Sequence, residues 1–299
     1  MGEDEAENWT QKSKKKVEES MKAFEDPEIK AVIPVTGGDE ELRILKYLEP
    51  ERLKSNPTRF YGINDNTNLH IYLWNLEIQS FYGGQFVADL MCGGELGEYT
   101  YDHLEKALFQ DSLGTVEPSE QFTDEFVDIG AEEITDGRKR YESSTWEFWN
   151  FNGENVEGRL FGGCFEIINW QMETQKYMPD QDEFEEKVLV LETSEEAPSE
   201  TTVKRWLMCL GENEILDKFS AILVGRPIRE PLHGEERTEK EKQEYHEDQK
   251  KRIKEEIKRY SPETPVVFDV DFGHTDPKIP LQLGAKAELN PVDRKIEFE

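Results

Sequence analysis

Twice within its first 75 residues, this 299-residue chain runs from a short apolar segment through a turn into a helical segment. Residues 31–35 lead through Gly37-Gly38 into a helical pattern at residues 39–48. Residues 59–63 lead in the same way into a helix at residues 65–75, whose apolar positions share one face. Strand, turn and helix in this repeated order are typical of a parallel sheet covered by helices. We therefore expect an N-terminal α/β domain.

The rest of the chain changes from alternating elements to mostly strands. A helix is expected at residues 201–210, whereas the charged helical stretch at residues 236–260 lacks a clear apolar stripe and should be solvated. Residues 114–155 are poor in aliphatic side chains and suit a linker. Strands are expected at residues 188–191, 220–224, 266–270, 280–287 and 295–298.

These patterns predict an α/β fold in three parts. Residues 1–125 form a domain with a flavodoxin-like parallel sheet, and residues 126–158 form a linker with an aromatic loop. Residues 159–299 form a C-terminal domain that is mostly β with helices. Because ligand sites favour domain interfaces, we expect the active cleft between the two domains.

Acidic residues outnumber basic ones by 66 to 36, which gives a formal net charge of −30. Such a charge repels phosphates and anionic lipids, so we expect neither a nucleic acid polymer nor a membrane as a partner. Self-repulsion also destabilises the folded chain unless salt screens it. A halophilic, salt-rich cytoplasm explains this balance, and an ordinarily acidic soluble protein is the alternative.

Three cysteines, Cys92, Cys164 and Cys209, show no CxxC spacing. An odd number of scattered cysteines without this spacing argues against a disulfide framework and a structural zinc site. No compact ligand motif surrounds the histidines, and we expect no metal and no cofactor. No segment has the pattern of a signal peptide or the length of a membrane span, so we expect a cytoplasmic protein.

The turn Gly62-Ile63-Asn64-Asp65 is a candidate nucleophile turn. A side chain just after a strand, at a helix N-terminus, faces free backbone N–H groups and the positive end of the helix dipole. Hydrolases place nucleophiles at such turns, where the next N–H helps to bind an oxyanion. Asn64 is also a favoured N-cap residue that can simply close the helix end, and this stretch alone favours that role.

Two further residues could act on protons near this turn. Glu192 ends the apolar strand at residues 188–191, where a carboxylate needs a partner, and such a group can orient an imidazolium. His274 follows another strand and a glycine, and histidine moves protons near neutral pH. The alternatives are an exposed carboxylate at a strand end and a loop histidine bonded to a carbonyl group.

The segments around Gly37-Gly38, Asn64, Glu192 and His274, in this order along the chain, resemble the LD-carboxypeptidase and microcin immunity family of serine peptidases. The resemblance implies that His274 is the general base, that Glu192 orients it, and that Asn64 occupies the place of the nucleophilic Ser. It also implies an oxyanion hole formed by the N–H groups of Asp65 and Gly38. The resemblance runs from about residue 17 to the C-terminus and rests on residues 33–38, 60–70, 156–163, 177–180, 188–192, 222–226 and 272–274.

Residues 145–149 resemble the aromatic loop of the immunity branch. This likeness implies that Trp146 and Trp149 bind substrate, with a Trp stacked on a nucleobase; ordinary packing of aromatic side chains is the alternative. A homodimer is also implied.

Three departures from the family pattern bear on function. Asn64 has no hydroxyl group for His274 to deprotonate, so the family mechanism cannot run. Family members begin with an additional strand, so we expect a truncated N-terminal domain. Cys164 stands where the family usually has Asn, which changes the hydrogen bonding of the site.

The resemblance implies a hydrolase that cleaves amide bonds in small peptides or aminoacyl-nucleotide conjugates by a Ser-Glu-His type of mechanism. Its partner would be a small peptide or aminoacyl-nucleotide ligand. The alternative is a catalytically inactive homologue that binds or sequesters such ligands.

Overall fold

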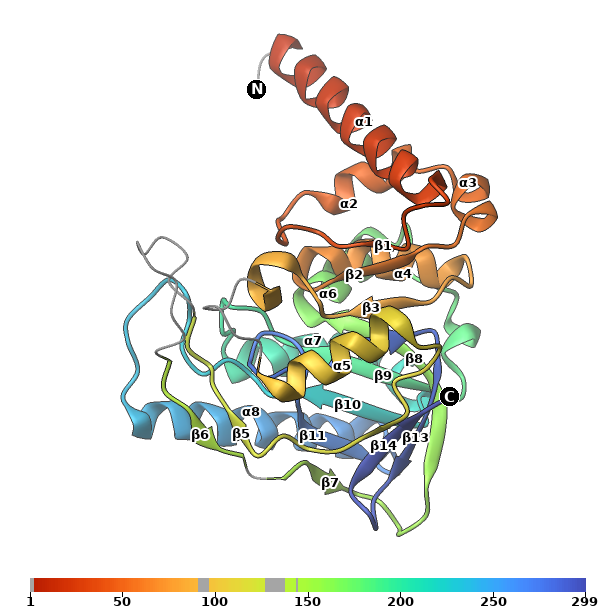
Figure 1. Cartoon of the computed structure of the whole chain (residues 1–299). Helices are drawn as coiled ribbons and strands as arrows, with labels where there is room; N and C mark the ends of the chain where they lie inside the picture. Colours follow the sequence, from red (N-terminus) through yellow and green to blue (C-terminus); the bar gives the residue numbers. More distant parts are fainter. Residues whose placement is uncertain (1–2, 91–96, 127–137, 144) are drawn as a thin grey trace.

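A four-stranded sheet, an eight-stranded sheet and a short two-stranded sheet, with the helices around them, make up the fold of the described residues (Figure 1). The computed structural model describes residues 3–90, 97–126, 138–143 and 145–299. Cys92 and residues 127–137 of the predicted linker lie outside the described residues.

The smaller sheet contains the parallel strands expected in the first part of the chain. Its order is β1 (Ala31–Val32), β2 (Arg59–Gly62), β3 (Ser80–Tyr82) and β12 (Leu281–Leu283). The first three strands are parallel, whereas β12 pairs antiparallel with β3. A strand from near the C-terminus therefore completes the N-terminal sheet.

Helices cover the smaller sheet on its outer side (Figure 1). Val17, Met21 and Phe24 recur every three or four residues along α1, so one face of this helix is buried against the helices below it. The helices before the larger sheet, in chain order, are α1 (Glu3–Glu25), α2 (Glu41–Ile44), η1 (Leu45–Tyr47), α3 (Pro50–Ser55), η2 (Asn64–Asn66), α4 (Thr67–Asn75), η3 (Phe86–Leu90) and α5 (Glu98–Phe109).

The larger sheet has eight strands, of which the central four are parallel. The parallel strands are β8 (Val156–Cys164), β9 (Lys187–Glu192), β10 (Ala221–Gly225) and β11 (Val266–Val270). The antiparallel strands at its two ends are β7 (Glu147–Trp149), beside β11, and β13 (Lys286–Asn290), β14 (Lys295–Phe298) and β4 (Thr115–Val116), beyond β8.

Alternate side chains of the parallel strands enter different cores, as the two-residue period of a strand requires. Val188 and Val190 pack toward the smaller sheet and α5, whereas Leu189 and Leu191 pack against the helices on the other face. The helices of this part are α6 (Phe165–Thr174), η4 (Gln181–Phe184), α7 (Glu200–Glu212), η5 (Leu216–Lys218) and α8 (Glu239–Tyr260).

Helix α8 was expected to be solvated, and that prediction is wrong. Its N-terminus is closed by a capping box between Thr238 and Glu241. One face of the helix is buried against the sheet and α7, and this face mixes apolar with polar side chains, which hides the stripe from a hydropathy pattern. Its buried members are Lys242, Tyr245, His246, Gln249, Ile253, Glu256 and Ile257.

The predicted linker contributes strands to the fold. Between residues 114 and 155, β4 and β7 join the larger sheet, and β5 (Gln121–Phe122) pairs with β6 (Tyr141–Glu142). The division at residues 125 and 159 stays a prediction; β8 runs across residue 159, and β4, β7 and β12 each pair with a strand on the other side of a boundary.

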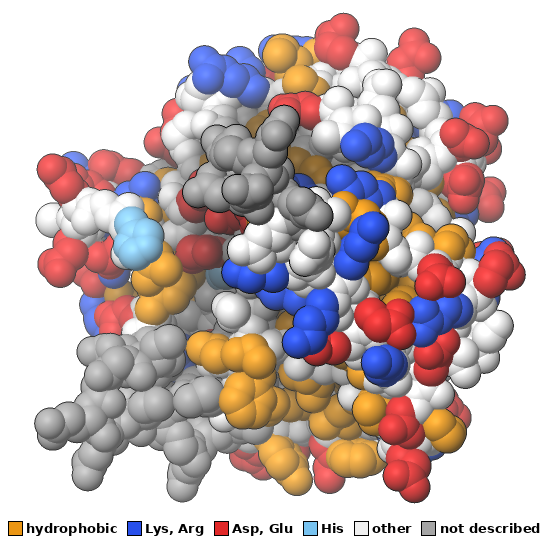
Figure 2. Space-filling view, turned by 90° about the horizontal axis from the view of Figure 1, so that it is seen from above, with side chains coloured by type: hydrophobic (Ala, Val, Ile, Leu, Met, Phe, Trp, Pro, Cys, Tyr) orange, Lys and Arg blue, Asp and Glu red, His pale blue; other side chains and the backbone are white. Residues whose placement is uncertain are grey.

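Figure 2 shows acidic side chains spread over the face seen from above, with Lys, Arg and hydrophobic side chains between them. Among the described residues, no helix is long and apolar enough to cross a membrane.

Candidate active site

The turn after β2 places Asn64 at the entrance to α4. Asn64 has φ 59°, a left-handed conformation that Asn tolerates better than most residues. Gly62 has φ 143°, and a Cβ atom there would lie 2.7 Å from Cβ of Asn66. The N–H of Asn64 donates to the Tyr82 hydroxyl at 3.2 Å. The turn therefore has the sharp strand-to-helix geometry expected from the sequence.

The side chain of Asn64 does not cap the helix. Its Nδ2 donates to the carboxylate of Glu195, at 2.9 Å from Oε2 and 3.2 Å from Oε1. The N-cap role that the turn alone favours is therefore wrong, because the carboxamide is drawn away from the helix end by a carboxylate on another segment.

Glu192 and His274 form a buried pair. Glu192 is the last residue of β9, and its Oε2 lies 2.8 Å from Nδ1 of His274. The Tyr82 hydroxyl donates to the other oxygen of Glu192. Gly273 allows this approach, because a Cβ there would lie 2.6 Å from Oε2 of Glu192. The alternatives, an exposed carboxylate for Glu192 and a carbonyl-bonded loop histidine for His274, are thus wrong.

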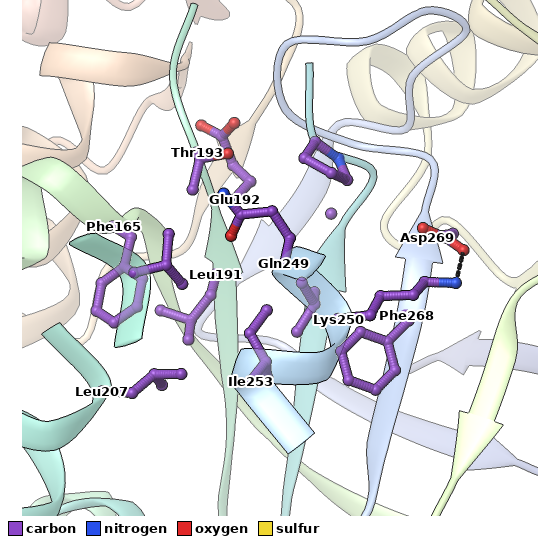
Figure 3. Close-up of a pocket in the computed structure, with 14 residues that line it drawn as sticks. Phe165, Leu191, Glu192, Thr193, Leu207, Gln249, Lys250, Ile253, Phe268 and Asp269 are labelled. Atoms are coloured by element: carbon purple, nitrogen blue, oxygen red, sulfur yellow. Dashed lines mark ion pairs between the residues drawn. The ribbon is translucent and has the colours of Figure 1, made fainter. Parts of the chain in front are cut away.

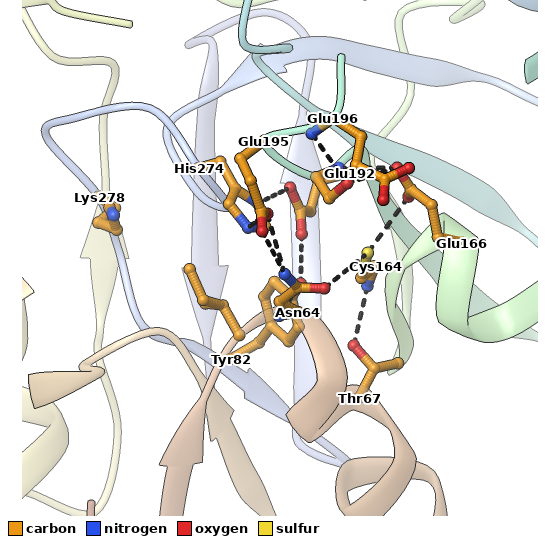
Figure 4. Close-up of polar contacts among 12 residues, drawn as sticks. Asn64, Thr67, Tyr82, Cys164, Glu166, Glu192, Glu195, Glu196, His274 and Lys278 are labelled. Atoms are coloured by element: carbon orange, nitrogen blue, oxygen red, sulfur yellow. Dashed lines mark hydrogen bonds and ion pairs between the residues drawn. The ribbon is translucent and has the colours of Figure 1, made fainter. Parts of the chain in front are cut away.

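Glu195 connects the histidine to the asparagine, as Figure 4 shows. Its Oε2 lies 3.0 Å from Nε2 of His274, and the same carboxylate accepts from Asn64. Both ring nitrogens of His274 therefore face carboxylates. The structure brings Asn64, Glu192 and His274 into one cluster, with Glu195 between the carboxamide and the imidazole.

The two carboxylates fix the charge of the imidazole. Burial lowers the pKa of His274, but the charges and hydrogen bonds of Glu192 and Glu195 outweigh it and raise the pKa to about 10. Burial raises the pKa of Glu195, and the hydrogen bond and charge of His274 outweigh it, so the net shift is downward. At neutral pH the ring is an imidazolium that donates from both nitrogens.

A second buried layer lies behind Asn64. The Cys164 thiol donates to Oε2 of Glu166 at 3.2 Å and lies 3.9 Å from Oδ1 of Asn64. Burial raises the pKa of Cys164 well above its usual value, and the neighbouring Glu166 adds to this shift. Burial also raises the pKa of Glu166. Cys164 is therefore a neutral thiol and not an alternative nucleophile.

The glycine pair after β1 lies against the Asn64 turn. A Cβ on Gly37 would lie 3.2 Å from Cβ of Asn64, and one on Gly38 would lie 3.2 Å from Oδ2 of Asp65. The Asp65 carboxylate accepts from the N–H groups of Glu40 and Glu41 at 2.9 and 3.0 Å. This arrangement holds the two segments together, and the oxyanion hole of Asp65 and Gly38 stays a prediction.

A cavity of about 440 Å³ opens at Asn64, Glu195 and His274. Its walls come from both halves of the chain. The cations on its walls are ion-paired: Arg138 with Asp276, Lys278 with Asp89 and Asp276, and His274 with the two glutamates. The remaining lining residues are Thr36, Gly37, Gly38, Asp39, Ile63, Gln85, Val87, Glu125, Phe126 and Leu232.

Neither predicted tryptophan is among the residues that line this cavity. Trp146 is fully buried, and its Nε1 donates to Oδ2 of Asp271 at 2.9 Å. Trp149 lies on β7 with its ring 6.5 Å from that of Phe268. Their role in stacking on a nucleobase stays a prediction.

A second, much smaller cavity of about 30 Å³ lies behind Glu192 (Figure 3). Leu191, Leu207 and Phe268 are among its largely apolar walls. This volume is close to that of one or two water molecules and far below that of a nucleotide or peptide. The small cavity therefore belongs to the core of the larger sheet.

Sequence patterns miss Glu195, which is central to the cluster. The Glu195-Glu196 pair three residues after β9 resembles any solvated acidic loop, and only its closeness to Glu192 along the chain was a signal. Tyr82 was missed because β3 has three residues, too few to show a period. Among the described residues, no group of three or more His, Cys, Asp or Glu side chains is placed to hold a metal ion.

Comparison with known proteins gives two matching family models. The LD-carboxypeptidase N-terminal domain matches residues 2–83, and the LD-carboxypeptidase C-terminal domain matches residues 157–289. The chain is 25% identical over 291 residues to the microcin C7 self-immunity protein MccF of Escherichia coli, covering 95% of this chain and 78% of that protein.

Solved structures show the same fold. A MccF-like protein from Streptococcus pneumoniae, in complex with AMP, superposes with a TM-score of 0.83 at 24% identity, covering 96% of this chain and 83% of that one. MccF in complex with aspartyl sulfamoyl adenosine superposes with a TM-score of 0.79 at 24% identity, covering 96% and 80%.

Proposed function

Since the chain belongs to the LD-carboxypeptidase family, we propose that it binds a small acyl-nucleotide or peptide ligand in the cavity at Asn64 without serine-dependent hydrolysis. This is the binding or sequestering alternative. The observation that carries it is the contact of Glu195 with both Asn64 and His274.

Two features of the site speak against the family reaction: the identity of residue 64 and the protonation of His274. Asn64 offers no hydroxyl group to attack a carbonyl carbon. A general base must also be unprotonated, and the pKa of His274, which Glu192 and Glu195 raise against the effect of burial to about 10, keeps the ring protonated at neutral pH. Loss of a triad nucleophile alone lowers turnover by about 10⁶-fold.

Ser-Glu-His type hydrolysis of small peptides or aminoacyl-nucleotide conjugates is the competing proposal. The observation that favours it is the pair of Glu192 and His274 at 2.8 Å, which keeps the orientation a triad needs. In that reading Asn64 would be the one missing group, and a serine at position 64 would restore turnover.

The relatives and the cavity support this ligand class. A relative of similar fold binds AMP, and another binds aspartyl sulfamoyl adenosine. A cavity of about 440 Å³ is in the range of small-molecule sites, and its mixed apolar and charged walls suit an acyl-nucleotide. A dimer, a cytoplasmic location and a halophilic source remain further proposals.

Calorimetry and a turnover assay test the proposal. We expect the natural chain to bind aspartyl sulfamoyl adenosine, which resists hydrolysis, and to leave an aspartyl-adenylate no less stable than in buffer. Asn64→Ser should gain little, because Glu195 still holds His274 protonated, whereas Asn64→Ser with Glu195→Ala should gain more. Turnover of the adenylate by the natural chain would refute the proposal.

A further inference from the structure

The carboxylate of Glu195 accepts hydrogen bonds from two side-chain donors at the inner end of the cavity. Nδ2 of Asn64 and Nε2 of His274 both point at its carboxylate. Nδ1 of His274 is taken by Glu192. The side-chain donors of Asn64 and His274 are therefore already occupied by carboxylates of the protein.

Acceptor atoms remain at this end. Among the described residues, the hydrogen-bond partner of Oδ1 of Asn64 is the thiol of Cys164, at 3.9 Å, which is a weak contact. The Glu195 side chain is 30% exposed and lines the cavity. A carboxylate has about four lone-pair directions, so Glu195 can accept further hydrogen bonds from a ligand.

The net charge of the side chains at this end of the cavity also disfavours an anionic ligand group. Glu192 and Glu195 carry two negative charges against the single positive charge of His274. The other lining cations, Arg138 and Lys278, are paired with aspartates. An anionic group at Asn64 would therefore meet excess negative charge, and a cationic group would find a partner.

We propose that Glu195 is the specificity-determining residue of this site and selects ligands whose acyl side chain carries an ammonium group rather than a carboxylate. This inference rests on the proposed function, because it places the acyl end of the ligand at Asn64, where the family acts on the acyl bond. A ligand carboxylate has to displace Glu195 from His274 and Asn64, whereas an ammonium group adds to the contacts already present.

Three sulfamoyl adenosines that differ in the charge of one side chain test the inference: lysyl, asparaginyl and aspartyl. Binding to the natural chain is measured by calorimetry at neutral pH and fixed salt. We expect the lysyl compound to bind about tenfold or more tightly than the aspartyl compound, a factor that corresponds to about 1.4 kcal/mol.

Glu195→Gln should remove most of this preference, because the side chain keeps its size and loses its charge. Glu196→Gln is the matched control: it removes the same charge from the next residue, whose side chain is exposed. The control should keep the lysyl-to-aspartyl ratio within about twofold. Glu195→Ala is a second variant with the same expectation, and melting temperatures show whether each variant folds.

The outcomes separate the two proposals. An unchanged ratio in Glu195→Gln and Glu195→Ala, or a natural preference for the aspartyl compound, overturns the assignment of Glu195 alone. Failure of all three compounds to bind the natural chain overturns the proposed function and the assignment with it. A ratio that collapses in the Glu195 variants and survives in Glu196→Gln supports both.

Discussion

Raising the pH should destabilise this protein through one histidine. The pKa of His274 rises because Glu192 and Glu195 outweigh the opposing effect of burial, from 6.5 in the unfolded chain to about 10 in the folded one. A raised pKa stabilises the folded state fully below pH 6.5, and this contribution is lost as the pH rises through about 10. At 1.36 kcal/mol per unit, the loss is about 5 kcal/mol.

Chemical denaturation between pH 6.5 and 10 measures this loss. The free energy of unfolding should fall more steeply for the natural chain than for His274→Gln, which removes the titrating group and leaves all other groups in place. NMR of the imidazole Cε1–H signals should show one ring that stays protonated beyond pH 9. A His274 signal that titrates near pH 6.5, or parallel stability curves for the two proteins, would refute the reasoning.

Three further predictions concern stability. Gly273→Ala should lower the free energy of unfolding, measured by urea denaturation, by about 1–3 kcal/mol more than Gly153→Ala. Both glycines have φ 94°, but only at Gly273 would the added Cβ lie 2.6 Å from the Glu192 carboxylate. Equal costs would rule out the steric argument. Asp271→Asn should cost about 3–5 kcal/mol, since it leaves the buried guanidinium of Arg226, now 3.2 Å from Oδ1, without its counter-charge. A loss below 1 kcal/mol would contradict that account. The melting temperature should rise with KCl concentration, because salt screens the net charge of −30. A flat salt series would count against the halophilic prediction.

Sequence patterns located most elements of the parallel sheets. Strands β9, β10 and β11 are short apolar runs buried on both faces, which is a strong signal. The segment at residues 280–287 was read as one strand, but Gly284, with φ 80°, divides it between two sheets. A two-residue period continues across such a glycine, so only the three-dimensional structure separates β12 from β13.

Part of the site could be predicted from the sequence. The family resemblance is confirmed by the matches to both LD-carboxypeptidase domain models, and it drew attention to Asn64, Glu192 and His274. The resemblance could not indicate Glu195, because its contacts with Asn64 and His274 span 131 and 79 positions of the chain and depend on loop geometry. Contacts between residues so far apart in the chain leave no periodic pattern in the sequence.

Strand β12 makes the smaller sheet, and with it the pocket, depend on residues far along the chain. Residues 281–283 close the sheet that residues 31–62 begin, and the ribosome delivers the chain from its N-terminus. Until those residues emerge, β3 presents an open edge, and Glu192 and His274 arrive late as well. A nascent chain that ends before Lys278 therefore lacks part of the lining of the cavity.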